Sequence, residues 1–431
     1  MHHDVVVVGG GAGGLELAAR LGRSLGRRQG PRRVLLVDRS VFHIWKPTLH
    51  EVAAGTLDSH QEGLSYTVLA RRNHFGFTLG ELRGLDTAGR TLRLSAIHDE
   101  QGRLLVPERS LSYRWLVLAV GSGSNFFGTP GAEHAYVLEQ AADAERFRRH
   151  LQAAFTRSAF AADKRLGIAI VGGGATGVEL SAELIEAHQE TLASLDAEQA
   201  FRLDLTIVEA GPRILAGLPE RISAQARTAL ERKQVRVLTG TRVQALQPDR
   251  LLTSQGEIAA DLIVWAAGIK AADANAGFGL ATNPAHQFVV NERLETSASG
   301  VYALGDCAAC PWVHAREAGK LVPARAQAAH QQAGHLAATL RRLLHERAAP
   351  DAPFVYRDFG SLVSLGENKG VGNLMGGLAG RNFFVEGLLA KWMYMSLHLM
   401  HHRAILGVGG TCVLALARLL QRRVSGRLKL H

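Results

Sequence analysis

The decapeptide VGGGAGGLEL at residues 8–17 returns as VGGGATGVEL at residues 171–180, and the two copies are identical at eight of ten positions. Each copy follows a short apolar run, Asp4–Val8 or Leu166–Val171, and precedes a segment with helical spacing of apolar residues. Continuous valine- and isoleucine-rich runs of this length are typical of strands buried in a parallel sheet. The sequence therefore predicts an α/β fold that contains two strand–turn–helix units.

Both turns have the G-x-G-x-x-G pattern, whose three glycines have separate tasks. The first permits a tight turn, the second lets the backbone approach a pyrophosphate, and the third lets the helix pack closely on the strand. The N–H groups of the helix N-terminus then face the phosphates. The glycines are Gly9, Gly11 and Gly14 in the first turn and Gly172, Gly174 and Gly177 in the second. Two copies predict two dinucleotide sites; the alternative is a pair of ordinary tight turns.

Each unit ends its second strand in an acidic residue, Asp38 after residues 34–37 and Glu209 after residues 203–208. A carboxylate at this position accepts hydrogen bonds from ribose hydroxyls. Glu209 favours the free 2′-hydroxyl of NAD over the 2′-phosphate of NADP, whereas the nearby Arg213 argues in the other direction. The sequence therefore favours NAD(H) at the second site and leaves NADP(H) open.

Three further apolar runs end in small residues and a glycine, and each is predicted to be a buried strand. They are Leu116–Ser122 with Gly121, Leu262–Ile269 with Gly268, and Val301–Ala308 with the pair Gly305-Asp306. We interpret the first two as the closing strands of the two dinucleotide units.

The composition limits the class of protein. The chain has 431 residues, of which 47% are hydrophobic, and this length predicts two or three domains. Residues 381–431 hold eight Lys or Arg and one acid, Glu386, so they supply +7 of the net charge of +10. Charge confined to the tail, with only 6% aromatic residues, argues against nucleic acid and favours an anionic membrane. Three cysteines suit a reducing compartment, and the sequence offers no pattern of metal ligands.

The tail itself predicts helices on a membrane surface. Residues 384–402 have helical periodicity, with Trp392 and Met393 on one side and Lys391 on the other. The uncharged stretch Ala404–Ala417 has 14 residues, fewer than the roughly eighteen of a spanning helix, so we expect peripheral attachment. The alternative is an ordinary core helix pair with a solvated basic end.

Over nearly its whole length the chain resembles the type II NADH:quinone oxidoreductases of proteobacterial respiration, which are flavoproteins with two dinucleotide-binding domains. The segments that carry the resemblance are HIWKPTLHEVAAG at 43–55, ATGVELSAEL at 175–184, VWAAGIKA at 264–271, RAQAAHQ at 325–331 and the final RLKLH. The resemblance implies an FAD-binding domain at 1–125 and 285–350, an inserted NADH-binding domain at 126–284 and a membrane-associating region at 351–431.

The resemblance also implies which residues bind the two nucleotides. Non-covalent FAD is expected at Gly9, Gly11, Gly14, Asp38, Lys46, Thr48, Gly121 and Asp306. The substrate NADH is expected at Gly172, Gly174, Gly177, Glu209 and Gly268. Lys46 and Thr48 fall in the loop that family members fold against the isoalloxazine ring, and Asp306 would contact the ribityl–phosphate region. A helix cap is the alternative role for Asp306.

Three residues are implied to act in catalysis. Gln327 and Gln331, on one helix face, would border the quinone site, where neutral amides can hydrogen-bond quinone carbonyls. A polar helix face is the alternative. Glu179 would lie near the flavin–nicotinamide junction and deliver a proton. Glu16 occupies the equivalent position in the first unit, so a structural role for Glu179 is equally open.

The implied activity is hydride transfer from NADH to FAD and then two-electron reduction of ubiquinone or menaquinone, without proton pumping, at the cytoplasmic face of the bacterial inner membrane. The choice of quinone and the existence of a homodimer stay open. Two alternatives are a sulfide:quinone oxidoreductase and a non-catalytic FAD/NAD(H)-binding redox sensor. The first needs a cysteine pair beside the flavin, but the first 306 residues contain no cysteine. We interpret Cys307 and Cys310 as unpaired thiols.

Overall fold

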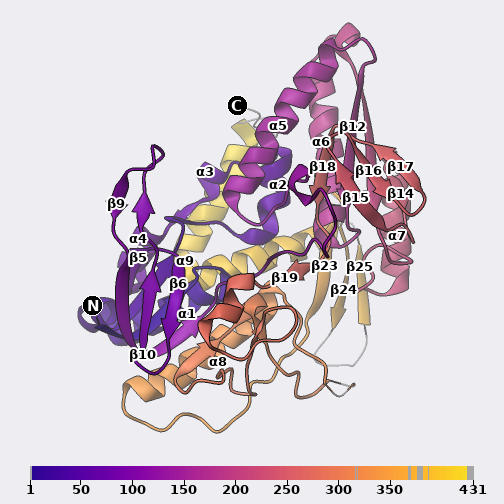
Figure 1. The fold of residues 1–431 in the computed structure, drawn as a ribbon. Helices are drawn as coiled ribbons and strands as arrows, with labels where there is room; N and C mark the ends of the chain where they lie inside the picture. Colours follow the sequence, from indigo (N-terminus) through magenta and orange to yellow (C-terminus); the bar gives the residue numbers. More distant parts are fainter. Residues whose placement is uncertain are drawn as a thin grey trace.

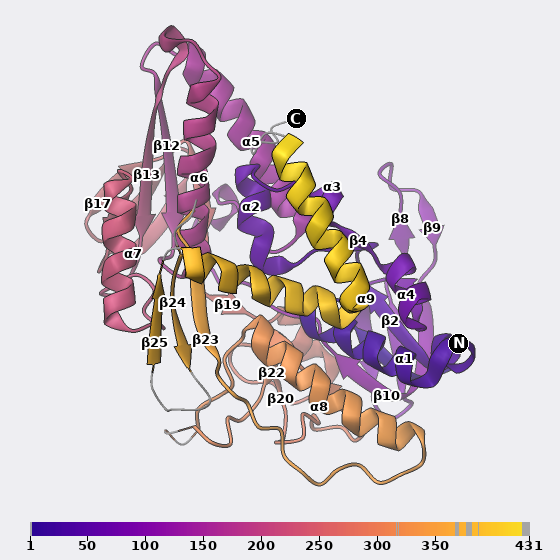
Figure 2. The ribbon, with the colours of Figure 1, turned by 180° about the vertical axis from the view of Figure 1, so that it is seen from behind.

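Two α/β units lie side by side, and the C-terminal strands and helix lie across one side of both (Figures 1 and 2). The computed structural model describes residues 2–315, 317, 319–366, 370–375, 382–386 and 388–424. For residues 370–375, 382–386, 388–398, 419 and 421–424 it describes the backbone alone.

The first unit is built on a seven-stranded sheet whose centre is β1 (His2–Val8). The order is β5–β2–β1–β10–β7–β6, and β21 pairs with the C-terminal half of β10. Strand β1 runs parallel to β2 and β10, with Val5 opposite both Val34 and Trp115. Their carboxyl ends therefore share one edge, which is where open parallel sheets bind ligands. The partner strands are β2 (Val34–Asp38), β5 (Gly76–Leu79), β6 (Leu82–Asp86), β7 (Thr91–Leu94), β10 (Arg109–Leu118) and β21 (Val301–Ala303).

The valine run of β1 is buried because helices cover the sheet. Val5, Val6 and Val7 are each 0% exposed. Helix α1 (Ala12–Arg33) packs against α8 (Ala326–Leu344), although some 300 residues separate them in the sequence. Burial on both faces explains why this strand is continuously apolar rather than alternating.

The second unit repeats the arrangement on a four-stranded parallel sheet of order β14–β13–β12–β18. The strands are β12 (Arg165–Val171), β13 (Arg202–Val208), β14 (Arg236–Leu238) and β18 (Leu262–Trp265), and the helices are α5 (Ala141–Phe160), α6 (Ala175–Ala193) and α7 (Glu220–Arg232). An antiparallel meander, β15 (Val243–Gln247), β16 (Arg250–Thr253) and β17 (Gly256–Ala259), follows β14.

Two connections join the units. The crossover strands β11 (Gly123–Ser124) and β19 (Ile269–Lys270) pair with each other. Helix α2 (Leu49–Ala54) belongs to the first unit by sequence but packs into the core of the second. The hydroxyl of Thr56, just after α2, donates to Glu183 of α6 at 2.7 Å. The loop around α2 therefore fixes how the units meet.

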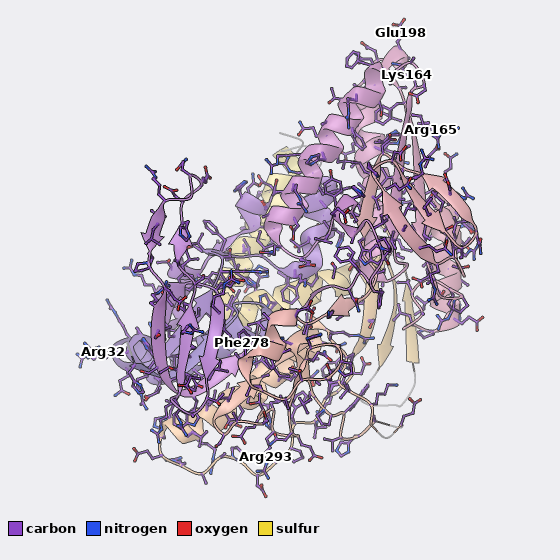
Figure 3. All side chains as sticks on the ribbon, viewed as in Figure 1. Arg32, Lys164, Arg165, Glu198, Phe278 and Arg293 are labelled. Carbon is purple, nitrogen blue, oxygen red and sulfur yellow. The ribbon has the colours of Figure 1, made fainter. Side chains whose placement is uncertain are left out.

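The segment after β19 packs on the first unit. The short helix η4 (Asp273–Phe278) lies against β6, Phe278 and Leu280 pack in the first core, and Figure 3 shows Phe278 far from Lys164 and Arg165 in the second unit. The domain bounds that the resemblance implies, 126–284 and 285–350, stay a prediction.

Short elements complete the described chain. They are β3 (Phe42–His43), η1 (Lys46–Thr48), α3 (Ser59–Glu62), β4 (Leu64–Ser65), α4 (Tyr66–Asn73), β8 (Ile97–His98), β9 (Leu104–Val106), η2 (Ala132–His134), η3 (Ala197–Gln199), η4 (Asp273–Phe278), β20 (Phe288–Val289), η5 (Gly305–Cys307) and β22 (Ala308–Ala309).

The C-terminal region contains the predicted helices and, before them, a sheet that the sequence did not predict. An antiparallel sheet of β23 (Gly360–Ser364), β24 (Gly370–Met375) and β25 (Asn382–Glu386) precedes α9 (Leu388–Val424), so the helix expected from residue 384 begins at Leu388, and residues 382–386 form a strand instead. The sheet packs on α6 and α7. The side chains of Trp392, Met393 and Lys391, on which the predicted amphipathic face depended, lie outside the described side chains.

Helix α9 bends at Gly407, whose φ of 72° and ψ of 174° are not helical. Figure 2 shows the two halves of α9 at an angle to each other. The first half lies across α1, and the second half extends away from it. The stretch Leu399–Arg418 is long and apolar enough to cross a membrane, contrary to the expectation that no segment would qualify. The bend falls inside this stretch, and the residues after it span only about 16 Å of the roughly 30 Å of a bilayer core. The geometry therefore argues against a straight span.

The bend leaves carbonyl groups without helical partners, and the first unit supplies donors to them. The guanidinium groups of Arg23 and Arg72 donate to the carbonyls of Ala404 at 2.8 Å and Leu406 at 2.6 Å. The buried amide of Asn73 donates to the carbonyl of Ile405 at 3.0 Å and accepts a hydrogen bond from Arg23 at 2.7 Å.

Replacing Asn73 tests this anchorage. Asn73→Leu should lower the free energy of unfolding by about 2 kcal/mol, because it strands a buried carbonyl and a guanidinium donor. Denaturant unfolding with saturating FAD measures the change. Arg71→Ala, an exposed position on the same helix, is the control and should stay within about 0.5 kcal/mol of the parent. An unchanged Asn73→Leu midpoint would show that these bonds do not hold α9.

Candidate functional site

The first glycine turn has room for a ligand at one position and none at the other two. Gly9 has a φ of +103°, and a Cβ there would lie 2.2 Å from the carbonyl oxygen of Ala119. A Cβ at Gly14 would lie 1.9 Å from the Gly9 oxygen, whereas a Cβ at Gly11 would meet no atom within 4 Å. The N–H of Gly10 donates to Asp38 Oδ2 at 2.6 Å. The backbone at Gly11 is therefore uncovered, at the position where a pyrophosphate would lie.

The second turn repeats this geometry. Gly172 has a φ of +112°, a Cβ at Gly177 would lie 2.1 Å from the Gly172 oxygen, and Gly174 faces open space. The N–H of Gly173 donates to Glu209 Oε2 at 2.7 Å. Both acids predicted from the sequence thus lie at their turns, at the N-termini of α1 and α6.

Arg213 does not face the ribose position of the second turn. Its guanidinium donates to the carbonyls of Leu218 and Ala216, each at 2.8 Å, and of Leu215 at 3.3 Å. Glu209 Oε1 meanwhile accepts the N–H of Gly211 at 2.6 Å. A guanidinium held by three carbonyls is not poised for a 2′-phosphate, so the site favours NAD(H) more clearly than the sequence did.

The predicted flavin residues outside the turn gather at the carboxyl edge of the first sheet. Ser122 Oγ donates to Asp306 Oδ2 at 2.9 Å, and Lys46 Nζ donates to the carbonyl of Ser122 at 2.9 Å. Gly121 has a φ of +73° and no neighbour within 4 Å of its Cβ position. Thr48 is buried and bonds locally to the carbonyl of Trp45 at 2.8 Å.

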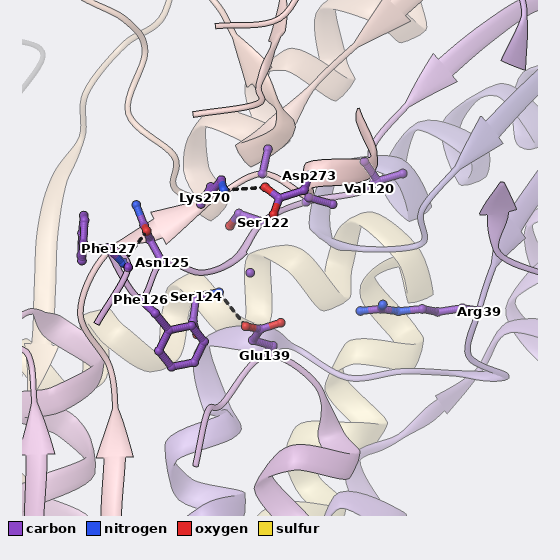
Figure 4. Close-up of a pocket in the computed structure, with 15 residues that line it drawn as sticks. Arg39, Val120, Ser122, Ser124, Asn125, Phe126, Phe127, Glu139, Lys270 and Asp273 are labelled. Atoms are coloured by element: carbon purple, nitrogen blue, oxygen red, sulfur yellow. Dashed lines mark hydrogen bonds and ion pairs between the residues drawn. The ribbon is translucent and has the colours of Figure 1, made fainter. Parts of the chain in front are cut away.

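A cavity of about 410 Å³ opens at this edge between the two units (Figure 4). Its walls come from the first sheet, the crossover strands and the loop after β19. They include Arg39, Gly121, Ser122, Phe126, Glu139 and Lys270. Lys270 pairs with Asp273 at 2.5 Å, and the N–H of Ser124 donates to Glu139 at 2.6 Å. Of the predicted nucleotide residues, Gly121 lines this cavity, beside Ser122, which bonds to Asp306.

Glu179 lies near the N-terminus of α6, where three parts of the chain meet. Its Oε1 accepts the N–H of Ser364 on β23 at 3.0 Å, and its Oε2 lies 3.7 Å from Nδ1 of His50 on α2. Burial, with a smaller contribution from the nearby carboxylates of Glu51 and Glu183, raises the pKa of Glu179 to about 8. The carboxyl group is therefore a buried acid that holds a proton at neutral pH.

Glu16, the equivalent residue of the first turn, has different partners. Its oxygens accept from Arg20 Nε at 2.7 Å and pair with Nδ1 of His330 at 2.6 Å. Glu16 is 0% exposed, and its contact with His330 ties α1 to α8. No lysine or arginine pairs with Glu179 within the described part of the chain, so two identical positions have opposite surroundings.

The two glutamines of α8 lie on one helix face, as predicted, and bond to the segment that leads into β23. Gln331 donates to the carbonyl of Arg357 at 2.9 Å and accepts its N–H at 3.0 Å. Gln327 donates to the carbonyl of Gly360 at 2.9 Å and accepts the N–H of Phe359 at 3.2 Å. Both amides therefore position residues 357–360.

Comparison with known proteins identifies the family. The profile of the pyridine nucleotide-disulphide oxidoreductases matches residues 3–333. A type II NADH:quinone oxidoreductase from Haemophilus influenzae is 39% identical over 449 residues, which cover 99% of this chain and 100% of that protein. The chain belongs to the type II NADH:quinone oxidoreductases. The resemblance inferred from the sequence is thereby confirmed.

Solved structures of the superfamily share the fold of this type II oxidoreductase. NDH2 from Plasmodium falciparum, in complex with NADH, matches with a TM-score of 0.80 over 99% of both chains at 17% identity. The sulfide:quinone oxidoreductase from Aquifex aeolicus matches with a TM-score of 0.71 over 100% of this chain and 96% of that chain at 16% identity. These similarities confirm the predicted α/β architecture.

Sequence reasoning missed a histidine contact between the first turn and α9 of this type II oxidoreductase. His43 Nδ1 lies 3.0 Å from the carbonyl oxygen of Gly10, and its Nε2 lies 2.9 Å from Nε2 of His401. Trp45 stacks on His401 with ring centroids 4.1 Å apart. Burial lowers the pKa of His43 to about 4, so the His43 ring is neutral at physiological pH. No periodicity or spacing links residues 358 apart.

Cys307 and Cys310 are buried and free. Burial raises the pKa of the Cys307 thiol to about 11 and that of Cys310 to about 12. Thiols of this kind stay protonated and are poor nucleophiles. Their surroundings do not suit the reactive pair that the sulfide:quinone alternative requires. Within the described residues no group of three or more His, Cys, Asp or Glu is arranged to hold a metal ion.

The buried acid predicts a stability change with pH. Because the folded-state pKa of Glu179 is raised from 4.5 to about 8, folding is penalised progressively as pH rises between those values. Glu179→Gln should therefore be more stable than the parent at pH 8.5, by a few kcal/mol, and about equal to it at pH 4.5. Denaturant midpoints of both proteins across this range provide the measurement. If the two midpoints differed by the same amount at every pH, the result would contradict a buried carboxyl group that is neutral at neutral pH.

Proposed function

We propose that this protein is a respiratory NADH:quinone oxidoreductase that passes electrons from NADH through non-covalently bound FAD to ubiquinone or menaquinone. The observation that carries the proposal is the pair of matching open glycine turns, at Gly11 and Gly174, with an acid at each. They occur in a chain that is 39% identical to a type II oxidoreductase over 99% of its length.

The residues at the first turn fit a flavin dinucleotide. Gly11 leaves the backbone open for the pyrophosphate, Asp38 lies where an adenosine ribose would bind, and Asp306 faces the same sheet edge. When bound, FAD accepts a hydride and releases two electrons. The proposed FAD residues are Gly9, Gly11, Gly14, Asp38, Lys46, Thr48, Gly121 and Asp306.

The second turn fits NADH. Gly174 is open, Glu209 offers a carboxylate to the ribose, and Arg213 is held away from it. Gly268 has a φ of +66°, and a Cβ there would strike the ring of Phe127 at 2.4 Å. The proposed NADH residues are Gly172, Gly174, Gly177, Glu209 and Gly268.

Quinone reduction consumes a proton, and Glu179 is the proposed donor. It is a buried acid that is protonated at neutral pH and lies beside the junction of the two units. Gln327 and Gln331 are proposed to border the quinone site by shaping residues 357–360, which they bond.

The decisive test is spectroscopic. The purified holoprotein should show flavin absorption that bleaches on anaerobic addition of NADH and returns on addition of a short-chain quinone. A redox sensor would bleach but not recover with quinone. Bleaching by sulfide but not by NADH, or no bleaching by either donor, would refute the proposed function.

Matched glycine variants assign the two turns. Gly11→Ala should lose flavin, because its Cβ would occupy the space proposed for the pyrophosphate, while Gly174→Ala should keep flavin and raise the KM for NADH about ten-fold or more. Flavin content by absorbance and steady-state kinetics measure the two effects. Gly277→Ala, where a Cβ also meets nothing within 4 Å, should change neither. Loss of flavin from Gly174→Ala would reverse the assignment.

The second half of α9 is proposed to lie on the cytoplasmic face of an anionic bilayer. Val408, Val413, Leu416 and Leu420 are 56–70% exposed, whereas the polar Thr411 on the same helix is 8% exposed. Ordinary surface helices turn their apolar side inward, so this reversed pattern requires an apolar partner. A bent helix on the surface offers no proton path, which is why we propose that the enzyme does not pump.

Charge substitutions test the membrane face. The double variant Val413→Glu/Leu416→Glu should bind vesicles of phosphatidylglycerol and phosphatidylethanolamine about ten-fold or more weakly, because it places carboxylates against anionic lipid. Co-sedimentation measures binding, and turnover with a short-chain quinone should be preserved. Leu104→Glu/Leu105→Glu, on the exposed β8–β9 hairpin, is the control. Equal loss in both double variants would show that α9 is not the binding face.

A further inference from the structure

The proposed reaction needs one proton from solvent in each turnover. NADH supplies a hydride, which carries one hydrogen nucleus with both electrons. The quinone takes up two electrons and two protons, so the balance is NADH + H⁺ + quinone → NAD⁺ + quinol. Glu179 is 7% exposed, so its carboxyl group meets little solvent, and a neighbour that passes on a proton would speed its return to the protonated form.

His50 is placed to be that neighbour. Its ring is 3% exposed, and Nδ1 lies 3.7 Å from Glu179 Oε2. The carbonyl of Pro47 accepts a hydrogen bond from the ring, and Nε2 is buried without a hydrogen-bond partner in the described structure. Nδ1 therefore serves both contacts, which assigns the proton of the neutral ring to Nδ1 and leaves a lone pair on Nε2.

We propose that His50 is a positioning residue that returns a proton to Glu179 after each turnover. This inference rests on the proposed role of Glu179 as proton donor. The carboxylate left by proton donation takes the Nδ1 proton of His50, while Nε2 takes a proton that originates in solvent. Proton exchange between the ring and solvent then returns His50 to its Nδ1–H form before the next turnover. Charge and atoms balance, because one proton enters the pair for each proton that leaves it. The 3.7 Å separation closes to a hydrogen bond with a shift of about 1 Å, and such contacts commonly tighten when substrate binds.

The surroundings keep this pair electrically neutral at rest. Glu51 and Glu183 face Glu179 and oppose its ionisation, and the N–H of Ser364 is the other polar group on it. Burial lowers the pKa of His50 to about 4 and raises that of Glu179 to about 8. Between these values the pair holds one transferable proton on the carboxyl group.

The first unit contains a natural comparison. Glu16 also faces a histidine, His330, at 2.6 Å, but Arg20 completes a permanent set of hydrogen bonds. The Glu16–His330 pair has the same position in its unit and the same residue types as the Glu179–His50 pair, but it is not proposed to donate a proton in the reaction. His330→Gln is therefore a matched control for His50→Gln.

The test separates the two half-reactions by stopped flow at pH 6–9. His50→Gln keeps a polar side chain but cannot transfer a proton. Flavin reduction by NADH should stay within about two-fold of the parent, and oxidation by a short-chain quinone should slow about ten-fold or more. The solvent deuterium isotope effect on the quinone step should rise, which a purely structural role would not cause. His330→Gln should alter neither step.

A second variant and a double variant keep the outcomes distinct. His50→Leu should match His50→Gln in the quinone step, and adding Glu179→Gln should cause no further loss, because both residues act in one transfer. A quinone step of parental rate and parental isotope effect in His50→Gln, with Glu179→Gln slow, would overturn the role of His50 alone. A parental rate in Glu179→Gln would instead refute Glu179 as the donor, and no reoxidation by quinone in the parent would refute the proposed function.

Discussion

The whole arrangement depends on one close approach of backbone to backbone, made twice. The third glycine of each turn lies against the carbonyl of the first, so a Cβ would be 1.9 Å away at Gly14 and 2.1 Å away at Gly177. This contact sets the angle between strand and helix, and the angle leaves Gly11 and Gly174 facing open space. The N–H of the intervening glycine then holds the strand-end acid, at 2.6 Å in one copy and 2.7 Å in the other. Two nucleotide sites thus follow from a single local geometry.

Identical local geometry does not give identical function, because the surroundings differ. The glutamate five residues beyond the second glycine is buried in both units. In the first unit α8 brings His330 to it, and Arg20 completes the pairing within α1. In the second unit α2 brings His50 and the carboxylate of Glu51, β23 brings the N–H of Ser364, and the carboxylate of Glu183 lies nearby. The first glutamate is therefore fixed in a structural network, and the second is left as a proton-holding acid.

This difference also marks the limit of sequence reasoning. Local patterns predicted the two turns, their acids and the buried parallel strands, since each depends on residues within a few dozen positions. The surroundings of Glu16 and Glu179 depend on elements hundreds of residues away, and the decapeptides that contain them are nearly identical. The β23–β25 sheet was missed for a related reason, because the apolar residues of 384–386 fit a helical period as well as a strand. The orientation of Arg213 could not be predicted either, because it is set by hydrogen bonds to backbone carbonyls, which the pattern of side chains does not indicate.

The contacts of α9 explain why its apolar face points outward. The first unit uses the polar side of this helix: His401 meets His43, and Thr411 and His402 are buried, with exposed fractions of 8% and 3%. The backbone carbonyls at the bend likewise accept hydrogen bonds from Arg23, Asn73 and Arg72. His401, His402 and Thr411 therefore face the first unit, while Val408, Val413, Leu416 and Leu420 of the second half remain exposed. The contacts that hold α9 in place therefore also create the surface proposed to meet lipid. One of these contacts reaches the carbonyl of Gly10 through His43.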